Sequence, residues 1–154
     1  MAIGIIGEPK PYILDRDRDV AQDLQTVFWI KPRSAKEANV TFAKFAGARE
    51  VGRGGREKYN SDALSKADRE AFLSIIEKIE NFFFAIPSPD NVHEKYLVDG
   101  KKMTIGTVEC IKVTTIDTVE GLSDVWRCLS VQDSIELLEV SNDFSRLTDN
   151  LKKV

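Results

Sequence analysis

Apolar residues recur at intervals of three and four positions between Ser65 and Ala85, which is the period of an α-helix. Ser65 can cap the start of such a helix, and two acidic residues in its first turn suit the helix dipole. The apolar stripe consists of Ala67, Ala71, Phe72, Ile75, Ile76, Ile79, Phe82 and Phe83. The pattern predicts one long helix over 65–85, whose aromatic end, Phe82 to Phe84, is either buried on nearly every side or bound to a partner.

Three other segments also have the helical period. Ser34 and Glu37 form a capping box, and the apolar spacing that follows predicts a short helix over 35–46. Near the carboxyl end, the apolar spacing predicts a helix over 120–129. Ser130 is expected to begin another helix, which carries the chain to its polar end.

Strand-like segments are fewer and shorter. Residues 26–30 are rich in β-branched and aromatic side chains and are followed by a proline, so they form the clearest strand candidate. Residues 12–14 are a second, short candidate. Asp99–Gly100 is a tight-turn signal and predicts a β-hairpin over 96–105, and the β-branched run 107–116 predicts a third strand.

Two segments lack a regular pattern. Glycine and prolines among the first eleven residues predict a flexible amino-terminal arm over 1–11. Residues 48–61 are rich in glycine and basic residues and predict a mobile loop. Its Gly-Arg-Gly-Gly sequence is similar to arginine–glycine segments that bind RNA, so Arg53 and Arg56 are candidate partner-binding residues. A phosphate-binding loop would need a Gly-Lys-Ser/Thr ending, which the segment does not have.

Together these segments predict an α+β fold in which helices dominate and a small antiparallel sheet or hairpin covers one side. The sequence has 154 residues, of which 42% are hydrophobic and 31% are charged, which is the balance of a globular protein. A chain of this length can bury about 68–70% of its extended-state surface. Residues 1–154 are therefore predicted to form a single domain.

Net charge and cysteine content narrow the function classes. The formal net charge of −3 argues against a dedicated binder of nucleic acid or of an anionic membrane, since both need a basic face. We expect neither a secretory leader nor a membrane span, because no apolar stretch has the required length. Cys110 and Cys128 are therefore expected to be buried and reduced, in a protein that works in a reducing cytosol.

Residue types that carry catalysis are sparse. His93 is the single histidine, and its surroundings predict a surface residue and not a catalyst or a metal ligand. Asp15, Asp17 and Asp19 have the alternate spacing of a calcium loop, but the glycine and glutamate that such a loop needs are missing. Two glutamates could act as acid and base only if they met across helices. We therefore expect no enzymatic activity, no catalytic residue, no metal and no cofactor.

Five stretches in order carry a likeness to known proteins. They are the short arm leading into 12–18, the aromatic strand 26–30 with Lys31-Pro32-Arg33-Ser34 after it, the segment Phe72 to Phe84, the turn at Asp99–Gly100, and an acidic helix running into 141–148. In outline this order resembles that of small tailed-phage morphogenesis proteins, some of which look like tail assembly chaperones. The resemblance implies a non-enzymatic role in virion assembly, in the host cytoplasm or in the assembled virion.

Two functions follow as hypotheses. In the first, the chain is a tail assembly chaperone or a minor virion component that binds the tape measure or tail tube protein, alone or as an oligomer. Its candidate contacts are Phe82, Phe83, Phe84 and Trp126, each of which can equally belong to the core. In the alternative, the chain is a small phage-encoded binder of nucleic acid or of a host protein, which acts through the basic loop 49–58. A site assembled from distant carboxylates would instead make it an enzyme.

Overall fold

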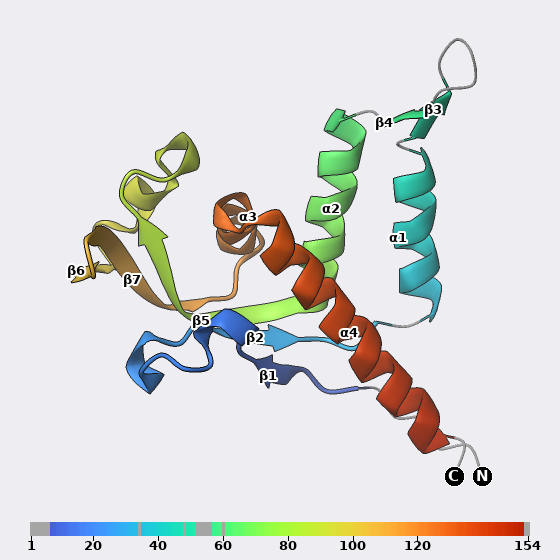
Figure 1. Ribbon diagram of the computed structural model, residues 1–154, viewed down its shortest axis with the longest axis horizontal. Coiled ribbons are helices and arrows are strands. Elements are labelled where there is room, and N and C mark those ends of the chain that lie inside the picture. Colours follow the sequence, from blue (N-terminus) through green and yellow to red (C-terminus); the bar gives the residue numbers. More distant parts are fainter. Residues whose placement is uncertain (1–6, 34, 48, 52–56, 60, 153–154) are drawn as a thin grey trace.

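The computed structural model describes residues 7–33, 35–47, 49–51, 57–59 and 61–152. These residues form α-helices and a five-stranded antiparallel sheet, which confirms the α+β class (Figure 1). The strand order is β1–β2–β5–β7–β6. The strands are β1 (Lys10–Tyr12), β2 (Val27–Ile30), β5 (Ile76–Ala85), β6 (Lys101–Ile105) and β7 (Val108–Ile116).

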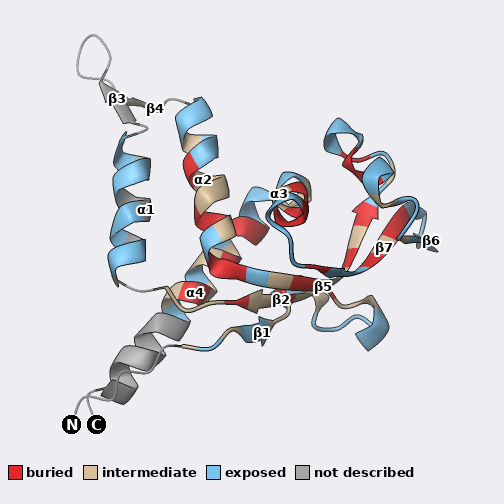
Figure 2. Cartoon of the chain, turned by 180° about the vertical axis from the view of Figure 1, so that it is seen from behind, coloured by how far each residue is buried: buried red, intermediate tan, exposed pale blue. Residues whose placement is uncertain are grey.

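The helices gather on one face of the sheet and beyond its edge (Figure 1). They are α1 (Ala35–Gly47), α2 (Ser61–Ile75), α3 (Val119–Cys128) and α4 (Val131–Lys152). α1 stands beside α2, and a short hairpin of β3 (Arg49–Val51) and β4 (Glu57–Tyr59) lies at the end of both helices that is far from the sheet. Figure 2 shows that buried residues follow β2 and β5 and the sides of α2 and α3 near the sheet, whereas the described side chains of α1 are exposed.

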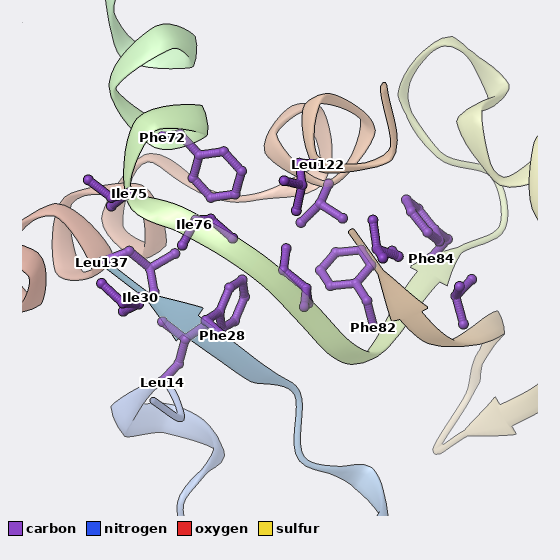
Figure 3. Packing of buried hydrophobic residues seen from close by; sticks show 14 of the residues in the cluster. Leu14, Phe28, Ile30, Phe72, Ile75, Ile76, Phe82, Phe84, Leu122 and Leu137 are labelled. Atoms are coloured by element: carbon purple, nitrogen blue, oxygen red, sulfur yellow. The ribbon is translucent and has the colours of Figure 1, made fainter. Parts of the chain in front are cut away.

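The core lies between the sheet and these helices (Figure 3). Side chains from β2 and β5 meet side chains from α2, α3 and α4 there. Each is at most 5% exposed, and they include Phe28, Ile30, Phe72, Ile75, Ile76, Phe84, Leu122 and Leu137. Because burying one such side chain stabilises a fold by about 1.5–3 kcal/mol, this layer holds the sheet and the helices together. Within the described ranges, no helix combines the length and the apolar character needed to cross a membrane.

The predicted helix over 65–85 is wrong in its second half. α2 ends at Ile75, and β5 begins at the next residue without a connecting loop. The backbone N–H of Lys31 donates to the carbonyl oxygen of Ile75 at 2.7 Å, so the chain after β2 satisfies the end of the helix. Isoleucine and phenylalanine, which favour strands, are frequent in 76–84. Pairing with strands on both sides outweighs the helical spacing of the apolar residues.

The predicted hairpin around Asp99–Gly100 is also wrong. Residues Pro89–Tyr96 form a 3₁₀ segment, and β6 pairs with β7 through a turn at Gly106, whose φ of +62° favours glycine. Gly100 is needed for a different reason. A Cβ atom at this position would lie 2.2 Å from Cγ2 of Ile111, because the chain passes close to the sheet here.

The other predicted elements are confirmed or shifted by a few residues. β2, β7, α1, α3 and the start of α4 lie where the sequence pattern placed them. The predicted arm over 1–11 ends inside the sheet, because β1 pairs with β2 from Lys10 onward, and residues 1–6 lie outside the described residues. The predicted loop over 48–61 contains β3 and β4 and reaches the start of α2 at Ser61.

Candidate functional site

β5 changes its neighbours at Asn81. Residues 76–80 of β5 lie beside β2, and residues 79–85 lie beside β7 on the other side. Since β2 pairs with β5 only from Val27 onward, no strand formed by the described residues lies beside the edge of β5 after Asn81. Asn81 has a φ of +56°, and Oγ1 of Thr26 donates to its carbonyl oxygen at 2.8 Å. The strand therefore bends at the point where one of its neighbours ends.

In this second half of β5, backbone groups alternate between β7 and the open edge. The N–H of Ile86 donates to a carbonyl oxygen of β7 at 2.9 Å. Because hydrogen-bonded residues alternate along an antiparallel pair, Phe84 and Phe82 also bond to β7. The N–H and C=O groups of Phe83 and Ala85 then face the open edge. In the part of the chain that the structure describes, no backbone or side-chain group bonds to them.

A groove of about 330 Å³ follows this open edge, and we call it the β5 groove. Its apolar lining comes from the segment between β1 and β2, from β5 with the prolines after it, and from the end of α3. The apolar lining includes Val20, Leu24, Phe83, Ala85, Pro87 and Leu129. The volume is at the small end of the range of about 300–1,000 Å³ that is usual for ligand clefts.

A second depression of about 400 Å³ adjoins the groove, and we call it the α3–α4 pocket. Trp126 and Val131 are part of its lining, and Pro89 and Leu129 line both depressions. The indole N–H of Trp126 donates to Oδ2 of Asp68 on α2 at 2.9 Å, which fixes the orientation of the ring. The β5 groove and the α3–α4 pocket therefore form one continuous surface.

The structure separates the three phenylalanines that were predicted to bind a partner. Phe84 is completely buried, and its ring stacks on Tyr96 with centroids 4.5 Å apart. Phe82 is 7% exposed and meets Phe84 edge to face at 4.8 Å. Figure 3 shows both rings on the side of β5 that faces Leu122 of α3. Phe82 and Phe84 are core residues, although Phe82 also borders the β5 groove.

Two other predicted contacts do reach the surface. Phe83 is half-buried in the β5 groove, with Nζ of Lys112 5.9 Å from the centroid of its ring. Trp126 lines the adjoining pocket. Arg53 and Arg56 lie outside the described residues, so the alternative function through the basic loop stays a prediction.

His93 is buried, contrary to the prediction of a surface residue. It is 7% exposed, and its Nδ1 accepts a hydrogen bond from the backbone N–H of Ser88 at 3.2 Å and lies 2.8 Å from Oγ of the same serine. That Oγ accepts from the backbone N–H of His93 at 2.9 Å. These bonds close a turn in which Asp90 and Asn91 have φ values of +53° and +52°. The pair therefore fixes the segment of Pro87 and Ser88 that lines the β5 groove.

A buried carboxylate anchors the 3₁₀ segment to α3. Asp124 is 2% exposed and accepts hydrogen bonds from the hydroxyl of Tyr96 at 3.0 Å and from Nζ of Lys95 at 3.3 Å. Burial and the bond to Asp124 raise the pKa of Tyr96, and hydrogen bonds to Glu120 and Asp124 raise the pKa of Lys95. At neutral pH, Tyr96 is therefore protonated and Lys95 is charged. Their bonds to Asp124 hold the 3₁₀ segment against α3.

Both thiols are free, and neither is activated. Burial raises the pKa of Cys110, which is 3% exposed as predicted. Cys128 is half-buried and lines the β5 groove, where burial and the charge of Asp124 raise its pKa to about 11. A protonated thiol is a poor nucleophile. Cys128 thus adds a small apolar side chain to the groove.

Neither the open edge of β5 nor the contribution of Pro89, Leu129 and Val131 to this surface was predicted from the sequence. The edge exists because β5 is longer than β2, and that difference was hidden when 76–85 was assigned to a helix. One signal was present. The two prolines that follow the aromatic run end a strand as readily as they end a helix.

Comparisons of the chain with protein-family models, with curated proteins and with solved structures found no match. Among the side chains that the structure describes, no group of three or more His, Cys, Asp or Glu residues is arranged to hold a metal ion. The surface formed by the β5 groove and the α3–α4 pocket is therefore the candidate functional site.

Proposed function

We propose that this chain is a non-enzymatic virion-assembly protein of a tailed phage, either a tail assembly chaperone or a minor tail component. It acts by binding another structural protein, with the tape measure and tail tube proteins as the first candidates. One observation carries the proposal: the adjoining β5 groove and α3–α4 pocket present Phe83 and Trp126 on one continuous surface. Aromatic side chains in such positions are typical of protein–protein interfaces.

Exposed apolar residues at the start of α4 extend this surface. Val131, in the α3–α4 pocket, is 75% exposed, and Ile135 is 49% exposed one helical turn later. Residues four apart lie on the same side of a helix, so these two side chains neighbour each other. Contiguous exposed apolar residues mark interaction sites more often than scattered ones do. The start of α4 therefore supports a binding role for this face of the molecule.

Co-expression with the tape measure and tail tube proteins, followed by affinity purification through a tag on this chain, tests the proposal. We expect one of the two proteins to co-purify in a stable complex. Val131→Glu should weaken that complex by about tenfold or more, because it places a charge in a contact surface. If neither protein co-purifies, the proposed function is wrong.

The chain offers a matched control for this variant. Val119 is the first residue of α3 as Val131 is of α4, and the two are 73% and 75% exposed. Thr118 and Ser130 cap the two helices through side-chain oxygens that accept backbone N–H bonds at 3.1 and 3.2 Å. Val119 lines neither depression, so Val119→Glu should leave the complex intact. If Val119→Glu weakens the complex as much as Val131→Glu does, the β5 groove and the α3–α4 pocket are not the binding surface.

A further inference from the structure

We propose that the partner docks by adding one extended, apolar segment that carries a carboxylate as a strand along the free edge of β5, beside Phe83 and Ala85. This inference rests on the proposed function and specifies how the partner is recognised. It follows from the backbone of β5, from the lining of the β5 groove, from the charges beside Phe83 and from a comparison with the other edges of the sheet.

The backbone requires an extended chain as the occupant. Phe83 and Ala85 both direct an N–H and a C=O group to the open edge, two residues apart. A strand in antiparallel register offers acceptors and donors at the same interval, and strand addition to a sheet edge is a recurring mode of peptide recognition. β2 does this for the first half of β5, as in the pair between Phe28 and Ile79. The added segment would continue the position of β2 past Asn81.

The lining of the β5 groove suits alternating apolar side chains. Successive side chains of a strand point to opposite faces of a sheet. The groove has apolar residues from two separate parts of the chain, Val20 and Leu24 before β2 and Leu129 after α3. A docked strand with apolar residues at alternate positions would bury them against this lining.

The cations beside Phe83 favour a carboxylate at that point of the segment, whereas the charged residues of the groove lining, Arg16 and Asp17, form an ion pair with each other. Lys112 of β7 pairs across the strands with Phe83 on one side and with Lys101 of β6 on the other. Like charges in directly opposite positions destabilise a sheet. Nζ of Lys112 donates to the backbone carbonyl of Asp23 at 3.3 Å, which leaves its positive charge in place. A carboxylate on the docked strand near Phe83 would offset the repulsion between the two lysines.

The two outer strands of the described sheet carry features that discourage strand addition. β6 begins with two exposed lysines, Lys101 and Lys102, and β1 contains Pro11. Lysine and proline are common protections of exposed sheet edges. Residues 82–85 of β5 contain only phenylalanine and alanine. Of the edges in the described sheet, the one in the β5 groove is therefore open to pairing, and it is recessed between protein walls.

A proline at position 85 tests the inference. Ala85→Pro removes an N–H group that faces the groove and leaves the bonds of Phe84 and Ile86 to β7 in place. Lys102→Pro makes the same change at the outer edge of β6, at an exposed residue that lines neither depression, so this variant is the matched control. The ligand is the tape measure or tail tube protein that co-purifies with the chain, and the affinity is measured by titration calorimetry.

We expect Ala85→Pro to weaken binding by about tenfold or more, as for loss of a central contact, and Lys102→Pro to bind as the natural chain does. Unchanged binding of a folded Ala85→Pro would overturn the inference while the proposed function stands.

If Ala85→Pro does not fold by circular dichroism, amide exchange of the natural complex decides: slowed exchange at Phe83 and Ala85 supports strand addition, and unchanged exchange overturns it. The natural chain alone could also form a dimer that the Ala85→Pro variant does not form. In that case the edge binds a second copy of the chain, and the choice of a different protein as the partner is wrong. If the natural chain binds neither protein, the proposed function and this inference both fall.

Discussion

The two halves of β5 differ both in composition and in surroundings. Residues 76–80 lie beside β2, residues 79 and 80 also pair with β7, and Ile76 and Ile79 are at most 1% exposed. Among the strands that the structure describes, residues 82–85 pair with β7 alone, and they border the β5 groove. A strand can thus keep its inward side chains in the core along its whole length and still present an open backbone edge along one part of it. The difference in strand pairing depends on where the neighbouring strand β2 ends.

The solvent-facing sides of the two halves differ as well. Around the first half, the indole N–H of Trp29 donates to Oε1 of Glu80 at 3.1 Å, and Nζ of Lys78 lies 4.8 Å from the centroid of the indole ring and 3.3 Å from the same Oε1. These three side chains satisfy one another. Around the second half, Phe83 has a cation above its ring but no comparable cover among the described residues. Substitutions on the two sides of Asn81 should therefore affect different properties.

The largest effect is expected in the first half. Ile79 is 0% exposed in the centre of the core, so Ile79→Ala should lower the free energy of unfolding by about 2–5 kcal/mol. Urea denaturation followed by circular dichroism measures this loss. A loss below about 1 kcal/mol would mean that the first half of β5 is not part of the core.

In the second half, the main effect should fall on binding. Phe83→Ala removes an aromatic side chain from the β5 groove and should weaken partner binding by about tenfold, while the fold remains intact because Phe82 and Phe84 keep their places. Titration calorimetry and urea denaturation of the same preparation separate the two quantities. If Phe83→Ala instead loses much stability and keeps its affinity for the partner, the second half of β5 supports the fold and not binding.

The bend between the halves should depend on the residue at position 81. Asn81 has a φ of +56°, a conformation that costs most residues about 1–2 kcal/mol and a β-branched residue the most. Asn81→Val should therefore reduce the free energy of unfolding by roughly this amount. Asn81→Gly is the control and should be nearly neutral, since glycine adopts this φ readily. Equal stability of the two variants in thermal unfolding would show that the bend is not strained.

The smallest effect concerns a carboxylate of the β5 groove. Burial, with repulsion from Asp133 and Glu136, raises the pKa of Asp17 above 3.8 despite the opposing charge of Arg16. A folded-state pKa above the unfolded value means that the ionised group costs stability at neutral pH, and that this cost disappears as the pH falls below 3.8. Asp17→Asn should thus be slightly more stable than the natural chain at neutral pH.

That advantage of Asp17→Asn should shrink as the pH is lowered through the raised pKa and vanish below the unfolded-state value of 3.8. Urea denaturation of both proteins across this pH range measures the difference. A variant that is less stable at neutral pH would show that the ionised Asp17 stabilises the groove, contrary to its surroundings.

Much of the fold was predictable where local pattern and tertiary pairing agree. Residues 26–30 and 107–116 are β-branched and form strands, and helices follow the capping residues before α3 and α4. The pattern failed at 76–85, because isoleucines and phenylalanines spaced by three and four also fit a strand that bends at Asn81. That bend shifts which residues face the core, so the alternation of a strand is interrupted.

The candidate site was predictable only in part. Phe83 and Trp126 could be named as exposed aromatic candidates, but their neighbours Pro89 and Leu129 depend on how 3₁₀ turns and helices pack, which local sequence does not show. His93 and Ser88 are five residues apart in a segment without regular pattern, and only the closed turn reveals that they bond to each other. A site that forms where one strand ends beside a longer strand depends on how the strands are arranged in the sheet. Local sequence does not show that arrangement.

Amide hydrogen exchange of the chain without its partner, measured residue by residue by nuclear magnetic resonance, tests the open edge most directly. The amides of Phe82 and Phe84 bond to β7 and should exchange slowly, whereas those of Phe83 and Ala85 should exchange at least about tenfold faster. This alternation is the predicted result. Equal, strong protection of all four amides in the monomer would mean that the edge is already occupied within the fold, and it would contradict an open edge in the second half of β5.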